Sequence, residues 1–294
     1  MLAGELATVL TGRHLDVFVF PLSFKEFLYF NNLELRDELD LIANRIELKR
    51  FLREYSEFGG FPEVVLSSYK KQLALTYFDD ILTKDIERRY LLMKSDKLRA
   101  LARFYLTNIS NPITFNSLKT SLGTTTNTIE KYSAYLEEAG MIFFVKRFSF
   151  KVKEQEKSAR KVYAIDVGLA NAIGFKFSAN YGKIAENMVA VELKRKMSQD
   201  PNLELYYWKN PRHEEVDFIV KYGQNVEQLI QVCWDITEYR TKERELKALL
   251  KASKELNCAN LVVITEDYEA EEELKEKAKF YKVKFIPLWK WLLE

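Results

Sequence analysis

The feature that most constrains the fold is a helical segment followed by three closely spaced apolar runs in the C-terminal part of the chain. Residues 182–197 have helical periodicity, and strand-like runs follow at 203–208, 215–220 and 229–233. The remaining predicted elements are a helix over 241–256, a strand over 260–264, an acidic helix over 269–279 and a strand over 283–287. Helices and strands that alternate in this way predict an α/β sandwich.

The composition is that of an ordinary globular protein. The 294 residues suit two or three domains, and 47% are hydrophobic and 30% charged. The formal charge of +2 is nearly balanced, so any basic surface must be local. No apolar run reaches the roughly 18 residues of a membrane-spanning helix, and the start lacks the pattern of a signal peptide. Cys233 and Cys258 form neither a disulfide framework nor a zinc set, so we expect a cytoplasmic protein with no membrane partner.

Residues 1–94 are predicted to be mainly helical. Thr11-Gly12-Arg13 indicates a turn, and the apolar run Val17–Phe20 predicts a short buried strand. Ser23 followed by Glu26 is the capping-box pattern that begins a helix. A lone buried strand indicates either that a larger sheet once preceded it or that it belongs to a short edge hairpin.

Residues 95–178 have the pattern of a winged helix-turn-helix. The predicted elements are a helix over 98–107, a second from the cap Thr114 to Leu122, a third from Thr124–Thr126 to Ala139, and strands over 141–145 and 161–165. Three helices followed by a two-stranded wing are typical of modules that read DNA.

The candidate DNA-binding residues lie on the third helix and along the wing. They are Thr125, Asn127, Lys131, Lys146, Arg147, Lys151, Lys153, Arg160 and Lys161. Several of these basic residues, such as Arg147, Lys151 and Lys153, would lie on one side and form a basic stripe if the first wing strand ran on through Lys153. Against this, the third helix carries one lysine and the glutamates Glu130, Glu137 and Glu138, a poor match to a polyanion. The alternative is a protein-interaction or domain-packing module with a solvated basic hairpin.

Two acidic residues are placed as in a metal-dependent nuclease. Glu186 has apolar residues at +3, +4 and +7, so its carboxylate points along an apolar helix face, and Asp217 interrupts an apolar strand. Such a site holds a hard divalent cation through carboxylates and adds a lysine from the next strand. That strand instead carries Gln231 and Cys233, which supply neither the charge nor the cation.

The degraded pattern leaves two interpretations open. Glu192 or Glu215 could replace the missing acid, and Lys209 or Arg212 the missing cation, which would preserve a divergent nuclease with weak Mg²⁺ or Mn²⁺ binding. In the other interpretation, which we favour, the fold is retained for binding or assembly.

In this order, the segments resemble an archaeal and bacterial family of AAA-type P-loop ATPases that carry a winged helix and a C-terminal restriction-endonuclease-like domain. The residues that carry the resemblance are Glu5–Thr8, Leu10–Arg13, Pro21–Phe24, Glu26–Phe27, Gly59–Glu63, Tyr163–Leu169, Gly182, Glu186–Asn187, Glu192–Leu193, Tyr207–Trp208 and Glu215–Phe218. The resemblance covers essentially the whole chain. It implies a remnant of the ATPase module with a helical lid region over 1–94, the winged helix over 95–178, and a restriction-endonuclease-like α/β sandwich over 179–294.

The family's phosphate-binding loop has no counterpart in this sequence. In the family it lies upstream of a segment like Leu10–Arg13, and no Gly-x-x-x-x-Gly-Lys-Ser/Thr pattern is present here. The resemblance therefore implies the C-terminal two-thirds of such an ATPase. ATP and Mg²⁺ are expected only for the full-length family, and Arg13, which resembles an arginine near the nucleotide, would have no phosphate to meet.

From the sequence we expect a portion of an AAA-type ATPase that is non-catalytic on its own and binds DNA or a protein partner. The partner could be the missing ATPase half, in which case ATP turnover would return only in the mixture. The alternative is a divergent Mg²⁺- or Mn²⁺-dependent nuclease that uses Glu186 and Asp217.

Overall fold

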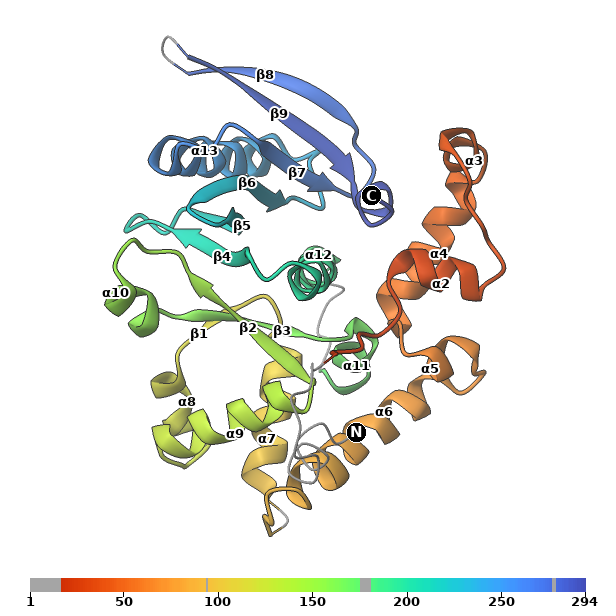
Figure 1. Cartoon of the computed structure of the whole chain (residues 1–294), viewed down its shortest axis with the longest axis vertical. Helices are drawn as coiled ribbons and strands as arrows, with labels where there is room; N and C mark the ends of the chain where they lie inside the picture. The colour runs from red at the N-terminus through yellow and green to blue at the C-terminus, as the bar shows by residue number, and fades with distance from the viewer. Residues whose placement is uncertain (1–16, 94, 175–180, 277–278) are drawn as a thin grey trace.

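A single mixed sheet organises the computed structural model, which describes residues 17–93, 95–174, 181–276 and 279–294 (Figure 1). Within these residues the sheet has nine strands in the order β1-β3-β2-β4-β5-β6-β7-β9-β8. The strands are β1 (Pro112–Ile113), β2 (Ile142–Arg147), β3 (Arg160–Ala164), β4 (Leu203–Lys209), β5 (Glu215–Tyr222), β6 (Asn225–Val232), β7 (Leu261–Thr265), β8 (Ala270–Glu276) and β9 (Lys279–Pro287).

Helices surround this sheet. The N-terminal ones are α2 (Phe24–Phe30), α3 (Glu38–Ala43), α4 (Arg45–Phe58), α5 (Pro62–Leu66), α6 (Lys70–Asp80) and the π-helical η1 (Ile81–Glu87). The middle ones are α7 (Asp96–Thr107), α8 (Phe115–Ser121), α9 (Thr126–Glu138), α10 (Val152–Lys157) and α11 (Val167–Ile173). The last are α12 (Tyr181–Gln199), α13 (Tyr239–Leu256) and α14 (Leu288–Trp291). No helix in the described ranges is both long and apolar enough to cross a membrane.

The C-terminal part of the sheet is sandwiched between α12 and α13. Successive residues of β7 alternate between two apolar clusters: Val262 and Ile264 belong to the cluster with α12, and Leu261 and Val263 to the cluster with α13. This alternation follows from the two-residue period of a strand. Both faces of β7 are covered, and its residues from Leu261 to Ile264 are all apolar, as is usual for parallel strands inside α/β proteins. The mixed α/β architecture expected from the sequence is therefore confirmed.

The strands of the middle region belong to the same sheet. β2 pairs with β3 in antiparallel register and with β4 in parallel register, through Lys146↔Tyr206 and Arg147↔Tyr207. α7 and α9 pack against this end of the sheet, in the lower part of Figure 1. The side chains of Thr114 and Thr125 cap α8 and α9, which confirms the predicted helix starts.

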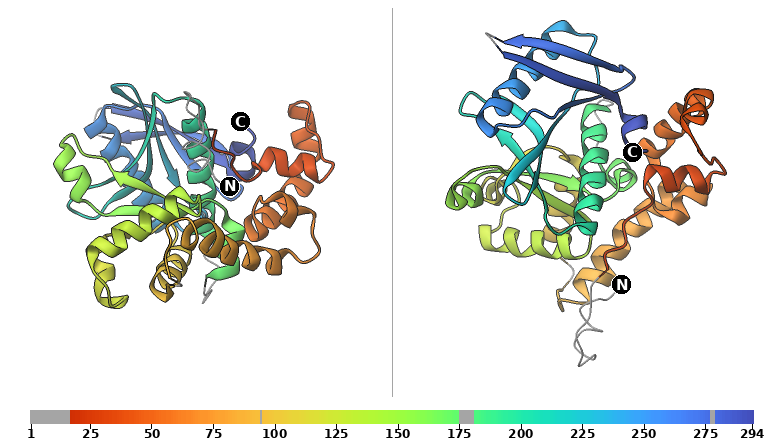
Figure 2. Two further views of the ribbon diagram at one scale, coloured as in Figure 1. Left: turned by 60° about the horizontal axis from the view of Figure 1, so that its bottom comes forward. Right: turned by 45° about the horizontal axis from the view of Figure 1, so that its top comes forward.

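Two glycine-containing segments far apart in the sequence interlock beside α11. Asp166 caps α11 by accepting from Leu169 N (3.0 Å) and also accepts from Gly60 N (2.7 Å). A Cβ on Gly168 would lie 1.9 Å from the carbonyl oxygen of Phe58, so only glycine allows the two backbones to approach so closely. This contact fixes the end of α4 against α11, and α4 also contacts α12 and α14 (Figure 2).

Two local predictions are wrong, and one lies outside the described residues. Val17–Phe20 forms no strand, and Val17 and Val19 are exposed, because the described residues offer these four no strand partner. The predicted acidic helix after residue 269 is the edge strand β8, whose glutamates pair across to lysines on β9, as in Glu271↔Lys284 and Glu273↔Lys282. The predicted turn at Thr11-Gly12-Arg13 falls outside the described ranges. The capping box of Ser23 and Glu26 is confirmed.

The basic stripe predicted along the wing is also wrong. β2 ends at Arg147, and the chain then forms α10, so Lys153 and Lys157 lie on a short helix instead of an extended strand. Glu154 and Glu156 lie between these lysines, and Glu154 pairs with Lys151 three residues earlier while Glu156 pairs with Lys146 on β2.

Candidate functional site

One lysine lies at the centre of the candidate site. Lys161, on β3, is only 1% exposed. Its Nζ lies 2.9 Å from Glu186 Oε1, 2.8 Å from Asp217 Oδ1 and 2.8 Å from Glu215 Oε1. An ammonium has three N–H donors, so each donor can meet a different carboxylate. We call these four residues the Lys161 cluster.

The geometry of β3 and α12 brings Lys161 and Glu186 together. Lys161 and Tyr163 lie two residues apart on a strand and so point to the same face. Both reach Glu186, whose Oε1 accepts from Lys161 Nζ at 2.9 Å and from the Tyr163 hydroxyl at 2.7 Å. The next residue of α12, Asn187, ties the helix to the end of β3 through two bonds of 2.8 Å with the backbone of Ala164.

A β-bulge in β5 turns two more carboxylates toward Lys161. Tyr206 pairs with Ile219 and Trp208 with Val216, so two residues of β5, Asp217 and Phe218, stand opposite Tyr207 alone. A bulge of this kind commonly re-aims side chains beside functional sites. Here it lets Glu215 and Asp217 face the lysine while Phe218 enters the apolar core with α12.

Asp217 is held in place by the next strand. Its Oδ2 accepts from Val232 N at 2.9 Å, and its own N–H donates to Gln231 Oε1 at 3.3 Å. The amide of Gln231 donates in turn to Glu245 Oε2, on α13, at 2.8 Å. Gln231 therefore bridges two acidic residues as a neutral group.

Lys209 supplies a second cation at the rim. Its Nζ lies 2.8 Å from Glu215 Oε2, so the two oxygens of Glu215 each meet a different lysine. Together with Lys209, the Lys161 cluster therefore forms a connected network of three carboxylates and two ammonium groups. Such a network is stable only when nearly every charge has a partner, because burial otherwise costs several kcal/mol per ion.

Burial and neighbouring charges shift the pKa values in opposite directions. Burial, followed by the Asp217 charge, raises the pKa of Glu186 to about 7 despite the nearby lysine. For Lys161, burial alone would lower the pKa, but Asp217 and Glu186 outweigh it and the pKa is raised, so the ammonium stays charged. Burial would raise the pKa of Glu215, but the charges of Lys161 and Lys209 lower it.

The residues as arranged do not fit a divalent cation. The point that three carboxylates share is occupied by an ammonium that uses all its donors, and a metal would have to displace it. No group of three or more metal-ligating side chains with suitable geometry is found in the part of the chain that the structure describes. No reaction step at the Lys161 cluster is therefore assigned to a metal ion.

The residues predicted for a nuclease site divide into two sets. Glu186 and Asp217 lie together in the Lys161 cluster, and Gln231 contacts Asp217. Of the possible substitutes, Glu215 and Lys209 also join the cluster. The others point elsewhere: Cys233 Sγ donates to the Asp235 carbonyl, Glu192 pairs with Arg195, and Arg212 is exposed in a turn.

The residue that sequence reasoning misassigned is Lys161. The prediction that it lies on the surface with the other wing cations is wrong, because it is buried among carboxylates. Tyr163 and Glu245 were not predicted at all. Lys161 follows Arg160 at the start of β3, before the apolar run begins, so no local signal distinguished it from the other wing cations.

The remaining DNA-binding candidates are only partly available. Thr125, Asn127, Lys131 and Lys153 are exposed. Lys146 pairs with Glu156 and Lys151 with Glu154 at the surface, Arg147 donates to the Lys209 carbonyl, and Arg160 lies over the ring of Phe115. Most of the cations predicted to contact DNA therefore already contact a carboxylate, a carbonyl or an aromatic ring of the same chain.

Comparison with known proteins gives two adjoining family matches. These are a domain of unknown function (DUF8612) over residues 49–180 and a domain of unknown function (DUF4143) over residues 181–291. The chain is 35% identical to the uncharacterized protein MJ1544 of Methanocaldococcus jannaschii, a match that covers all of this chain and 66% of the relative. It is 32% identical to an uncharacterized protein of Haemophilus influenzae over 81% of this chain and 58% of that protein. The chain thus spans less than two thirds of either relative, and no solved structure matches it significantly.

Proposed function

We propose that this chain is a binding and assembly portion of an AAA-type ATPase and does not itself hydrolyse nucleotide or nucleic acid. The observation that carries the proposal is the position of Lys161. Its ammonium lies between the acidic residues that the predicted nuclease site would use to bind a metal, and it bonds Glu186, Glu215 and Asp217 at 2.8–2.9 Å. Because these carboxylates are already paired with a lysine of the same chain, a structural role is favoured. Removing any partner would leave a buried charge unpaired.

The cluster joins three parts of the chain. Lys161 comes from β3, Glu186 from α12, and Glu215 and Asp217 from β5. In this proposal the middle region is a winged helix-turn-helix, and the cluster fixes it to a nuclease-like α/β sandwich. A rigid pair of domains of this kind is suited to hold a partner in a constant orientation.

A protein partner is the form of this proposal that the surface supports better. Glu130, Glu137 and Glu138 lie on α9, and the neighbouring cations Lys146 and Lys151 are already paired. Both relatives extend beyond the segment that this chain matches. We therefore propose that the partner is a nucleotide-binding polypeptide equivalent to the unmatched part of the relatives.

The test is association with that segment in solution. The unmatched part of the Methanocaldococcus relative, expressed separately, would be mixed with this chain and analysed by size-exclusion chromatography with light scattering. We expect co-elution, and ATP turnover only in the mixture. Separate elution, together with failure to retain duplex or branched DNA in a gel shift at low salt, would refute a binding role.

A metal-dependent nuclease remains the second candidate, for one specific reason. Three carboxylates from α12 and β5 converge at a single point, and a second lysine, Lys209, bonds one of them from the rim. If Lys161 could withdraw, these groups would resemble a hydrolytic site. Supercoiled, linear and junction DNA would be incubated with the chain and Mn²⁺. Cleavage that disappears in Asp217→Ala would establish this candidate and overturn the first.

A further inference from the structure

A second site lies on the other side of α12, where three parallel strands end. β6 pairs in parallel with β7, and β7 with β9. Trp234 follows the end of β6, Glu266 follows the end of β7, and Leu288 follows the end of β9. The carboxyl ends of parallel strands are where open α/β sheets generally bind their ligands, because the connecting loops diverge there and leave a crevice.

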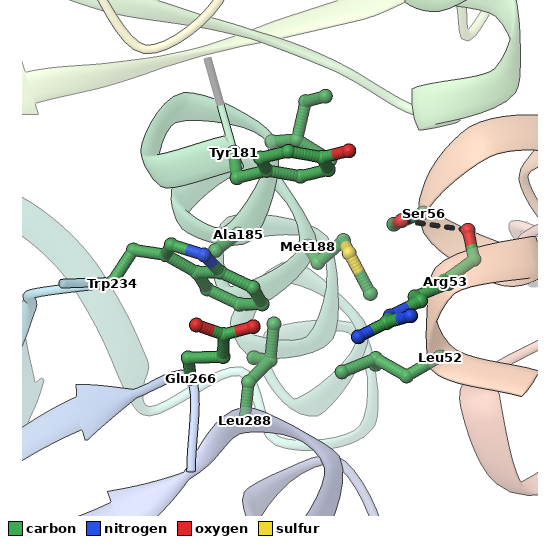
Figure 3. A pocket seen from close by; sticks show the side chains of 10 residues that line it. Leu52, Arg53, Ser56, Tyr181, Ala185, Met188, Trp234, Glu266 and Leu288 are labelled. Carbon is green, nitrogen blue, oxygen red and sulfur yellow. Dashed lines mark hydrogen bonds between the residues drawn. The ribbon is translucent and has the colours of Figure 1, made fainter. Parts of the chain in front are cut away.

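A cavity of about 210 Å³ occupies this position (Figure 3). Its walls come from α4, α12, α14 and the two loops, with Leu52, Ala185, Met188 and Leu288 giving it an apolar lining. Trp234 forms one side and stacks on Tyr181, with ring centroids 6.1 Å apart and an interplanar angle of 20°. The cavity is smaller than the roughly 300–1,000 Å³ typical of sites for drug-sized ligands, so its ligand must be small.

Two opposite charges point into this cavity from facing walls. Figure 3 shows the Arg53 guanidinium and the Glu266 carboxylate directed toward its centre. They form no ion pair with each other, and among the described residues neither side chain has another ionic partner. Lys49 and Arg45, one and two turns earlier on the same stripe of α4, both pair with Asp267. Arg53 is the member of this stripe that faces the cavity instead.

We propose that this cavity binds a small zwitterion with an apolar body, namely a free α-amino acid with a large hydrophobic or aromatic side chain. The ligand's carboxylate would meet Arg53, its ammonium group would meet Glu266, and its side chain would lie against Trp234 and Met188. Charge-assisted bonds of this kind are the strong ones, and the planar guanidinium can hold a carboxylate through two parallel bonds.

A neutral planar ligand such as a nucleobase fits the charges less well. A bound ligand covers the Arg53 and Glu266 side chains and removes water from both. Each charge then needs an oppositely charged partner. A zwitterion provides both within one small molecule, whereas a neutral base offers only uncharged donors and acceptors. The nucleoside is therefore included in the test as the competing ligand.

The test is isothermal titration calorimetry of the full chain with L-phenylalanine, L-tryptophan and L-leucine at millimolar concentrations. Phenethylamine and 3-phenylpropionate, which each lack one of the two charges, serve as matched ligands, and guanosine as the neutral one. We expect at least one amino acid to bind, and each single-charge analogue to bind about tenfold or more weakly. Arg53→Gln and Glu266→Gln should each weaken the amino acid by about tenfold or more.

Arg50→Gln is the control variant, since Arg50 is on the same helix and pairs at the surface with Glu47. It should leave the affinity unchanged. Arg53 and Glu266 are both exposed, so their variants should fold, and circular dichroism would check this. Absence of heat with all three amino acids, equal binding of phenethylamine, or preferential binding of guanosine would each overturn the proposal.

Discussion

Lys161 Nζ lies 2.8 Å from Asp217 Oδ1, although the two residues are 56 positions apart in the sequence. The contact joins β3 to the bulge of β5, and the same ammonium also bonds Glu186 on α12. Because β3 belongs to the middle region and α12 to the C-terminal one, this one side chain connects the segments that the two family models match separately.

Replacing Lys161 with methionine should destabilise the protein strongly. The variant keeps much of the side-chain volume but leaves the buried carboxylates of Glu186 and Asp217 without their shared cation. We expect a loss of about 3–5 kcal/mol in the free energy of unfolding, the range for breaking a buried ion pair on one side. Urea denaturation would measure it. Lys153→Met, at an exposed position, should stay within about 0.5 kcal/mol of the wild type, and a similar loss in both variants would contradict the prediction.

The same variant should acquire a response to divalent cations. With the ammonium gone, Glu186, Glu215 and Asp217 present carboxylate oxygens toward one point, and these are the ligands that Mg²⁺ and Mn²⁺ prefer. We expect Mn²⁺ to raise the melting temperature of Lys161→Met while leaving that of the wild type unchanged. The double variant Lys161→Met/Asp217→Asn should lose the response, and a wild-type response as large as the variant's would show that Lys161 does not close the site.

Stability should fall as the pH rises through neutrality because of Glu186. Burial raises its pKa from 4.5 to about 7 in the folded protein, so between these values the folded state holds a proton that the unfolded state releases. This contribution is fully present below about pH 4.5 and is lost as the pH passes 7. Glu186→Gln imitates the protonated form. As the pH rises from 5 to 8, its stability should therefore increase relative to that of the wild type.

Comparing the pH dependence of stability of the wild type and of Glu186→Gln separates the contribution of Glu186 from that of other buried acids. Burial also raises the pKa of Asp166 to about 6, which gives a slope of the same sign in both proteins. Chemical denaturation at several pH values would give the difference. A difference in the free energy of unfolding that does not change with pH would show that Glu186 titrates alike in the folded and unfolded states.

Any binding of duplex DNA should be weak and independent of base sequence. Of the cations predicted to contact DNA, Lys131 and Lys153 are exposed, and no ion pair holds either among the described residues. We expect a Kd of about 10⁻⁴–10⁻⁶ M at physiological salt, the usual range for non-specific binding. Lys131→Ala should reduce the slope of log K against log salt by about 1. Nanomolar binding that depends on sequence, measured by fluorescence anisotropy, would contradict this prediction.

The sequence by itself determined which acids lie in the interior and where the helices of the middle region begin. The apolar residues at +3, +4 and +7 place Glu186 against the sheet, and the apolar neighbours of Asp217 place it in a buried strand. The hydroxyls of Thr114 and Thr125 cap helices because the capping bond is made within three residues. Information of this kind is local, so a single sequence contains it.

Only the tertiary structure decided what those acids meet. Lys161 looks like one more wing cation until β3 pairs with β2 and α12 packs across it, and Glu215 and Asp217 meet it only once β5 has paired with β4 in the same sheet. The glutamate-rich segment from 270 to 276 became a strand because β9 offered it hydrogen bonds and lysines. Strand pairing and bulges depend on partners far along the chain, and local periodicity does not contain them.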